Sequence, residues 1–171
     1  MKPPFILVTL LAVGFLSGCA TGNGGLAVET VGPLSTRPAL AISSPSNGLL
    51  LVYSAFRRNA DFNSRNPYAQ EYSDYEILTP DGQLFRKVHN NSGTMSQDAV
   101  PVELPPGKYQ VSARANGYGV VKIPVVVVAQ RSTVLHLEGG DAWPAGAAFN
   151  STNTVRLPNG LVIGPKAADD L

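Results

Sequence analysis

The feature that most constrains the fold is a strict alternation of apolar and polar side chains in the second half of the chain. Residues 109–116 read Tyr-Gln-Val-Ser-Ala-Arg-Ala-Asn, with an apolar or aromatic residue at each odd position. Successive side chains of a β-strand point to opposite faces, so this pattern predicts a strand with one face in a core and one in water. The side chains expected to be buried are Tyr109, Val111 and Ala113, and those expected to be exposed are Gln110, Ser112 and Arg114.

The composition of the chain extends this prediction to the whole fold. Among 171 residues there are 17 Gly and 14 Pro, and only 15% are charged, as in proteins built from many short strands and turns. No stretch of ten or more residues shows a helical apolar period of 3.6. We therefore expect an all-β fold, a small antiparallel β-sandwich of about seven to eight strands with a C-terminal hairpin extension.

Turn residues divide the chain into the expected strands. Pro80-Asp81-Gly82 separates two apolar-containing runs and predicts a β-hairpin, because Gly adopts positive φ without strain. Asn159-Gly160 predicts a second hairpin over residues 155–163. The expected strands cover residues 39–43, 49–56, 72–79, 83–89, 100–104, 109–116, 120–128 and 133–138. In the last of these we expect Thr133, Leu135 and Leu137 to face inward and His136 to face outward.

The second half of the chain resembles a known type of module. Leu104-Pro-Pro-Gly107-Lys-Tyr109-x-Val111, the pair Gly117-Tyr118, the Val-rich strand that follows and Thr133-Val-Leu-His-Leu137 resemble carboxypeptidase regulatory-like and PEGA-type modules. The resemblance covers residues 98–139 well and 39–89 loosely. It implies a transthyretin-like or immunoglobulin-like β-sandwich of an exported bacterial protein, without a catalytic residue. The chain departs from the PEGA pattern through a longer segment at Arg57–Glu71.

The N-terminus predicts export and lipid attachment. Lys2 precedes an apolar run over residues 5–15, which has the length of a signal-peptide core and is too short to span a bilayer. Leu16-Ser17-Gly18-Cys19 resembles a bacterial lipobox. The resemblance implies cleavage before Cys19, a diacylglycerol thioether on this cysteine, and a fatty acyl group such as palmitate on the new amine. Cys19 is the only cysteine of the chain. In proteobacterial lipoproteins, a residue such as Ala20 after the cysteine implies export to the outer membrane. The alternative is an ordinary secretory signal with Cys19 incidental.

These features give four expected regions. They are a lipoprotein signal peptide at 1–18, a lipidated flexible tether at 19–37, a β-sandwich domain at 38–139 and a C-terminal extension at 140–171 that contains Trp143. Residues 22–27 match a G-x-G-x-x-A dinucleotide fingerprint. That fingerprint requires a strand before it and a helix after it. Because neither is expected here, we reject a phosphate-binding loop.

One long segment, Arg57–Glu71, lacks regular alternation and supplies the candidate site. A connection of about fifteen residues inside a small domain is unusual and is often functional. Its guanidinium and aromatic groups suit a carbohydrate, a carboxylate or a protein surface. The alternative is a solvated loop whose aromatic rings cover one edge of the sandwich. The candidate residues are Arg57, Arg58, Phe62, Arg65 and Tyr68.

Known catalytic and metal-binding motifs are absent from the sequence. There is no G-x-S-x-G, H-E-x-x-H, Walker loop or paired-cysteine site. Asp74 and Glu76 share one expected strand face, but nothing predicts a cleft around them, and His89 and His136 are single histidines. The transthyretin-like hydrolases end in Tyr-Arg-Gly-Ser, whereas this chain ends in Ala-Asp-Asp-Leu. We therefore expect no enzymatic activity, no metal and no cofactor.

Two classes of function are consistent with these features. The first is a lipid-anchored structural or interaction module that binds an envelope protein or a cell-wall polymer at the periplasmic or outer surface of the membrane. The second is a lipoprotein that binds a carbohydrate or another small ligand through residues 57–72. Without Lys2 the chain has twelve basic and twelve acidic residues, so its charge does not favour nucleic acid.

Overall fold

The described part of the chain consists of β-strands joined by turns. The computed structural model describes residues 28–38, 43–55, 72–90, 98–139 and 152–168, and within these ranges it contains no helix. The strands are β1 (Pro33–Pro38), β2 (Gly48–Tyr53), β3 (Tyr75–Leu78), β4 (Leu84–Val88), β5 (Val102–Leu104), β6 (Gly107–Ala115), β7 (Gly119–Val127), β8 (Arg131–His136), β9 (Thr154–Arg156) and β10 (Val162–Pro165). The expected all-β fold is confirmed.

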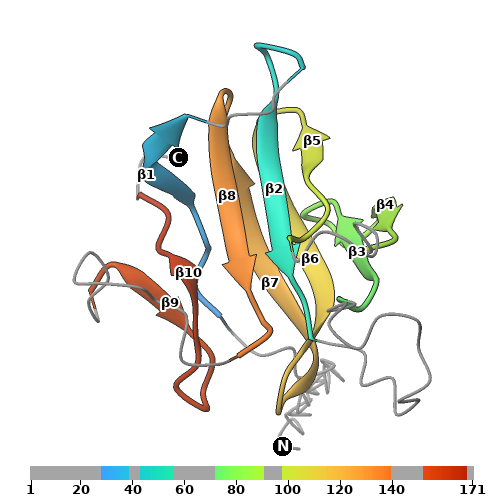
Figure 1. Cartoon of the computed structure of the whole chain (residues 1–171), viewed down its shortest axis with the longest axis vertical. Coiled ribbons are helices and arrows are strands. Elements are labelled where there is room, and N and C mark those ends of the chain that lie inside the picture. Colours follow the sequence, from blue (N-terminus) through green and yellow to red (C-terminus); the bar gives the residue numbers. More distant parts are fainter. Residues whose placement is uncertain (1–27, 39–42, 56–71, 91–97, 140–151, 169–171) are drawn as a thin grey trace, which may run out of the picture.

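Eight of these strands form two sheets that pack face to face (Figure 1). One sheet has the order β1-β8-β2-β5 and the other has the order β4-β3-β6-β7. Apolar side chains from the inner faces of both sheets form one core. Its fully buried members include Leu50, Val52, Ile77, Leu104, Val111, Ile123, Val125, Leu135 and Leu137.

The alternation predicted for residues 109–116 is confirmed in β6. This strand pairs with β7 through nine consecutive residue pairs, from Gly107↔Val127 to Ala115↔Gly119. Gln110 and Ser112 are half-buried, whereas Arg114 is exposed. The buried side chains are Tyr109, Val111, Ala113 and Ala115.

The sheet β1-β8-β2-β5 is mixed rather than wholly antiparallel. Strands β2 and β8 run parallel, with Leu49 opposite Ser132 and Tyr53 opposite His136. Parallel neighbours need a long connection. Here that connection contains β3 to β7, which include all four strands of the other sheet.

Residues that precede the first expected strand in the chain form part of one side of the sandwich. Val31 is fully buried, donates its N–H to the carbonyl of Pro124 (2.9 Å) and accepts from Val126 N–H (2.9 Å) at the edge of β7. The chain then continues as β1, which pairs with β8. Part of the range expected to be a tether, residues 19–37, therefore belongs to the sheet. Ser43, expected to end the first strand, lies in a bend, and residues 39–42 lie outside the described ranges.

The expected C-terminal hairpin is confirmed and is integrated into the same side. Strands β9 and β10 pair antiparallel, and Gly160 in their turn has φ of 87°. Pro165 accepts a hydrogen bond from Gly32 N–H, and Thr30 accepts one from Ala167 N–H, both at 2.9 Å. The N-terminal segment therefore lies between β7 and β10, so the hairpin extends the side of the sandwich.

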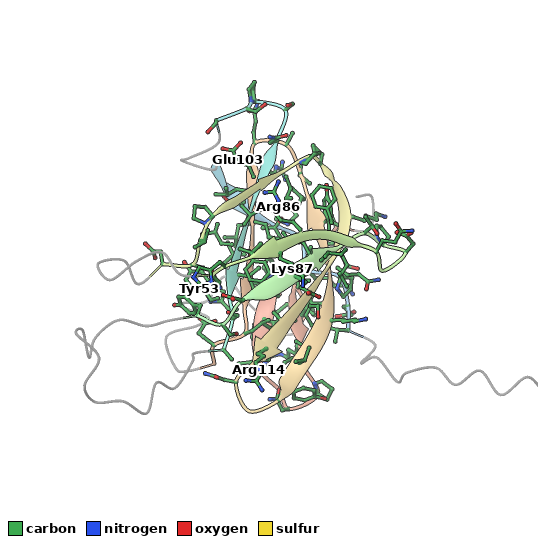
Figure 2. The ribbon with its side chains drawn as sticks, turned by 90° about the vertical axis from the view of Figure 1, so that its right-hand side faces the viewer. Tyr53, Arg86, Lys87, Glu103 and Arg114 are labelled. Atoms are coloured by element: carbon green, nitrogen blue, oxygen red, sulfur yellow. The ribbon has the colours of Figure 1, made fainter. Side chains whose placement is uncertain are left out.

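The opposite side of the sandwich ends in the edge strands β4 and β5. The side chains of Leu84 and Phe85 on β4 are 52% and 43% exposed. Figure 2 shows Arg86 and Glu103 on this side, where Arg86 Nη1 approaches the Glu103 carbonyl at 3.5 Å. The aliphatic stem of such an arginine can cover apolar edge atoms while its charge stays in water.

Candidate functional site

One end of the sandwich is the place where several connections leave the described core. The segments 56–71, 91–97 and 140–151 follow Ala55, Asn90 and Gly139 in the chain. Their flanking residues lie together, because Ala55 accepts a hydrogen bond from Ser73 N–H (2.9 Å) and Tyr53 accepts one from Leu137 N–H (2.7 Å). Functional residues often lie on connections held by a rigid scaffold. The described side chains at this end therefore form the candidate site.

A largely buried aromatic cluster lies at this end of the sandwich. The ring of Tyr53, labelled in Figure 2, stacks on the ring of His136 with centroids 4.6 Å apart and planes inclined by 2°. The ring of Tyr72 meets Tyr53 edge-on at 5.5 Å. The contact with His136 follows from the parallel pairing of β2 and β8, which places Tyr53 and His136 side by side.

His136 is held by a carboxylate two residues further along the chain. Its Nδ1 lies 2.6 Å from Oε1 of Glu138, and the two side chains are only 14% and 15% exposed. His136 points away from the core as expected, but it is largely covered rather than solvated. The second oxygen of Glu138, Oε2, is buried and has no hydrogen-bond partner.

The two tyrosines of the cluster are held in their neutral form. Burial and then the charge of Glu138 raise the pKa of Tyr72 to about 12. Burial, followed by the charges of Asp98 and Glu138, also raises the pKa of Tyr53. Near neutral pH both phenols keep their protons, so the site offers hydroxyl groups and a carboxylate but no phenolate nucleophile.

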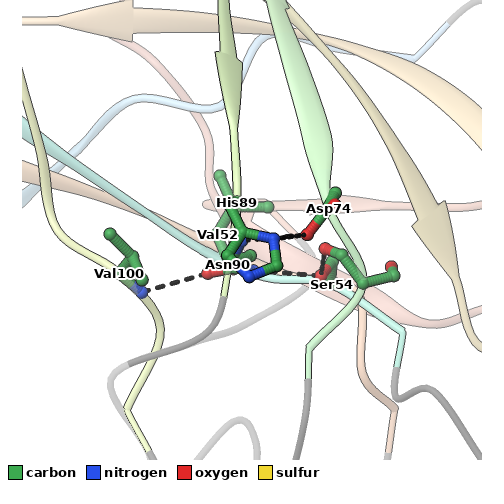
Figure 3. Close-up of polar contacts among 7 residues, drawn as sticks. Val52, Ser54, Asp74, His89, Asn90 and Val100 are labelled. Atoms are coloured by element: carbon green, nitrogen blue, oxygen red, sulfur yellow. Dashed lines mark hydrogen bonds and ion pairs between the residues drawn. The ribbon is translucent and has the colours of Figure 1, made fainter. Parts of the chain in front are cut away.

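A buried asparagine, Asn90, joins neighbouring parts of the chain at this end of the sandwich (Figure 3). Asn90 is fully buried, and its Nδ2 donates to the Val52 carbonyl (2.8 Å) and to Ser54 Oγ (3.0 Å). Its Oδ1 accepts from Val100 N–H at 3.0 Å. The amide therefore joins β2 to the residues on both sides of segment 91–97.

A groove of about 510 Å³ lies next to this end, on the outer face of the β4-β3-β6-β7 sheet. Asp74 and Glu76 both line it, although the sequence predicted no cleft around them. Asp74 Oδ1 lies 2.9 Å from His89 Nδ1, and Glu76 Oε1 lies 3.3 Å from Lys87 Nζ. Each carboxylate has its own partner, so the two do not form an acid–base pair.

The sequence-predicted site residues are not brought into the described structure. Cys19, the loop candidates and Trp143 all lie outside the described residues. The loop candidates are Arg57, Arg58, Phe62, Arg65 and Tyr68. The two histidines, His89 and His136, each pair with a carboxylate near them in the structure.

Sequence reasoning missed the cluster of Tyr53, Tyr72, His136 and Glu138. Tyr53 was assigned to a mostly apolar strand, and Tyr72 to the start of a hairpin strand. These side chains come together through the parallel pairing of β2 and β8. No local sequence pattern encodes that pairing, so the sequence carries no signal that could have found the cluster.

Neither metal ligation nor similarity to known proteins adds to this description. Within the described ranges, no three His, Cys, Asp or Glu side chains gather in an arrangement that could hold a metal ion. The same ranges contain no helix long and apolar enough to cross a bilayer. No protein family, curated protein or solved structure matches the chain.

Proposed function

We propose that the protein is a lipid-anchored component of the bacterial cell envelope that acts as a non-catalytic interaction module. The lipobox-like Leu16-Ser17-Gly18-Cys19 supports the anchor, and Ala20 supports the outer membrane as its location. The protein would face the periplasm or the cell surface. Its partner would be an envelope protein or a cell-wall polymer.

The Tyr53–His136–Glu138 cluster is the observation that most supports an interaction role. It combines stacked rings with a buried, unpartnered carboxylate oxygen at the end where three connections leave the core. Tyrosine and histidine side chains of this kind contribute large contact areas together with polar groups.

The anchor is tested by replacing the only thiol. In Cys19→Ser the thioether cannot form, so radiolabelled palmitate should enter the wild-type protein but not the variant. Equal labelling of both proteins would contradict the lipid anchor.

The interaction role is tested with Arg58→Ala combined with Tyr68→Ala. If the segment that leaves Ala55 contacts a partner, this double variant should lose capture of the partner from envelope extract, while its melting temperature stays near the wild-type value. Arg131→Ala, an exposed position at the start of β8, is the control and should retain capture. Unchanged capture by the double variant would show that this segment is not the contact surface.

A second candidate function is binding of a carbohydrate or another small ligand. The half-buried ring of Tyr53, which meets the ring of Tyr72 edge-on, favours it, because sugars pack on aromatic faces. Calorimetric titration with neutral cell-wall oligosaccharides should then give heat with the wild type and none with Tyr53→Ala. An interaction with protein partners alone would give no heat in either titration.

A further inference from the structure

The β6–β7 hairpin has a charge pattern that differs from the rest of its sheet. Its two strands carry Lys108, Arg114 and Lys122 and contain no carboxylate. All three cations are exposed, and no described ion pair neutralises them. The carboxylates of Asp74 and Glu76 line a groove together with Arg114 and Val120, but each has its own partner, His89 for Asp74 and Lys87 for Glu76.

Two of these cations lie near the turn of the hairpin, beside an exposed apolar residue. Arg114 lies opposite Val120, and Ser112 lies opposite Lys122 two residues further along β6 and β7, on the same face of the hairpin. Val120 is 67% exposed, the largest value among the exposed large hydrophobic residues of the described ranges. Cations around an exposed apolar side chain are typical of surfaces that lie in the headgroup region of a membrane.

The chain enters the domain along the same hairpin. Val31 pairs parallel with Val125, so the residues before Val31 run beside β7 towards Lys122 and the turn. Figure 1 shows the first described residues descending towards the same end of the sandwich as the β6–β7 turn. The described chain therefore begins towards the turn end of the hairpin, where Arg114 and Lys122 lie.

The length of that segment keeps the hairpin close to the bilayer. Only eight residues separate Cys19 from Val28. Even fully extended, a chain of this length spans about 30 Å, and a flexible one has a typical end-to-end distance of about 15–18 Å. A domain on such a short tether repeatedly meets the membrane surface.

We infer that the turn end of the β6–β7 hairpin docks on anionic lipid headgroups of the membrane that holds the anchor. Arg114 and Lys122 contact the phosphate groups, and Val120 lies among the headgroups. This inference rests on the proposed lipid anchor and adds an orientation to it. Each cation near an anionic membrane surface increases docking about fivefold, and the attraction is screened by salt.

The test uses the lipidated full-length protein in vesicles, with one added cysteine as the labelling site. Acylation occupies Cys19, so a thiol-reactive fluorophore labels only Ser112→Cys near the turn or, as a matched control, Ser46→Cys. Ser46 precedes the start of β2, at the opposite end of that strand from Tyr53. The vesicles contain phosphatidylcholine alone or mixed with phosphatidylglycerol, together with a lipid whose headgroup carries a nitroxide quencher.

We expect stronger quenching at position 112 than at position 46 in the anionic vesicles, and loss of that difference in neutral vesicles and at high salt. Lys122→Gln should lower the docked fraction about fivefold. Lys108→Gln, a matched change at the other end of the hairpin, should change it much less. Melting curves of the labelled variants establish that each is folded.

Each other outcome is informative. Equal quenching at the two positions, or in the two kinds of vesicle, would overturn the inferred orientation while the protein still floats with the vesicles. Failure to float would instead contradict the lipid anchor itself. If dextran sulfate shields the label at position 112 but anionic vesicles do not, the hairpin binds a soluble anionic polymer, and the membrane orientation is wrong.

Discussion

At the scale of single residues, Asn90 holds the candidate end of the sandwich together. Its amide uses both Nδ2 protons and one oxygen lone pair, and none of its surface is exposed. Removing such a group leaves its partners buried without hydrogen bonds, which costs more than a net hydrogen bond contributes. The Val52 carbonyl and the Val100 N–H would both lose their partner.

We therefore predict that Asn90→Ala lowers the free energy of unfolding by about 2–4 kcal/mol. Asn159→Ala is the matched control, because Asn159 is exposed in a turn and accepts one hydrogen bond, from Leu161 N–H at 3.1 Å. The control should cost less than about 1 kcal/mol. Urea denaturation measures the free energy of unfolding of both variants. Equal decreases would show that the buried hydrogen bonds of Asn90 contribute no more than one exposed hydrogen bond.

The tyrosines of the cluster predict a dependence of stability on alkaline pH. The folded-state pKa of Tyr72, about 12, lies above the ordinary value of 10.0. The unfolded chain therefore releases this proton first, so stability should be unaffected below about pH 10 and should fall as the pH rises towards 12. In Tyr72→Phe the fall should be shallower, and the absorbance change of tyrosinate formation near pH 12 should be smaller. An identical pH profile in the variant would contradict this role of Tyr72.

At the scale of elements, local patterns predicted those strands whose partners are close in sequence. The alternation in β6 and the turns at Asp81-Gly82 and Asn159-Gly160 each specify a face or a hairpin without reference to the rest of the chain. Strand β1 escaped prediction because Pro33 and Pro38 argue against a strand in the middle of a sheet. A strand with prolines is tolerated at the edge of a sheet, because there only one side of the strand has to provide N–H donors to a neighbouring strand.

The candidate site was less predictable than the fold for the same reason. Segment 57–71 was singled out because it lacks alternation, but the described cluster at the end where it leaves the core comes from three parts of the chain: Tyr53, Tyr72, and His136 with Glu138. Tyr53 and His136 meet only because β2 and β8 pair in parallel across more than eighty residues of sequence. The composition of this segment remains a prediction, whereas the aromatic cluster at the end where it leaves the core depends on a tertiary pairing.

The close packing of β10 against the N-terminal segment predicts the effect of one added methyl group. A Cβ at Gly164 would lie 2.6 Å from Val31 Cγ1 and 2.9 Å from the Val134 carbonyl oxygen. Because such crowding forces neighbouring backbone to move, Gly164→Ala should cost about 1–3 kcal/mol. The control Gly107→Ala meets only the Tyr109 ring, at 3.6 Å, and should cost less than about 1 kcal/mol. If thermal melts of the two variants coincide, the packing of β10 is looser than described.

At the scale of the whole molecule, the two long sides of the sandwich differ. One side is closed by residues 30–32 and the β9–β10 hairpin, whereas the other ends in β4 and β5. The hairpin turn near Arg114 lies at the same end as the candidate site, because Ala55 N–H donates to the Arg114 carbonyl at 2.7 Å. If that end faces the bilayer, a partner of the Tyr53–His136–Glu138 cluster has to be reachable at the membrane surface. A protein of the same membrane fits this condition better than a distant cell-wall polymer.

The closed side also predicts that the C-terminal hairpin is required for folding. Four of its apolar side chains are buried: Val155, Leu157, Val162 and Ile163. Each contributes about 1.5–3 kcal/mol when buried, so their loss removes at least about 6 kcal/mol. The total stability of a domain is only about 5–15 kcal/mol. A chain that ends at residue 151 also leaves Val31 uncovered and Gly32 N–H without its acceptor, the Pro165 carbonyl.

We therefore expect the chain that ends at residue 151 to lack a cooperative melting transition and to be cleaved rapidly by protease. A chain that ends at Ala168 keeps both strands of the hairpin and should melt like the full-length protein. Circular dichroism during heating, with limited proteolysis at a fixed temperature, compares the two truncations. A cooperative transition at the full-length temperature in the shorter chain would show that the hairpin is a separable extension. A cooperative transition that is lost in the chain ending at residue 151 but kept in the chain ending at Ala168 would establish the hairpin as part of the sandwich.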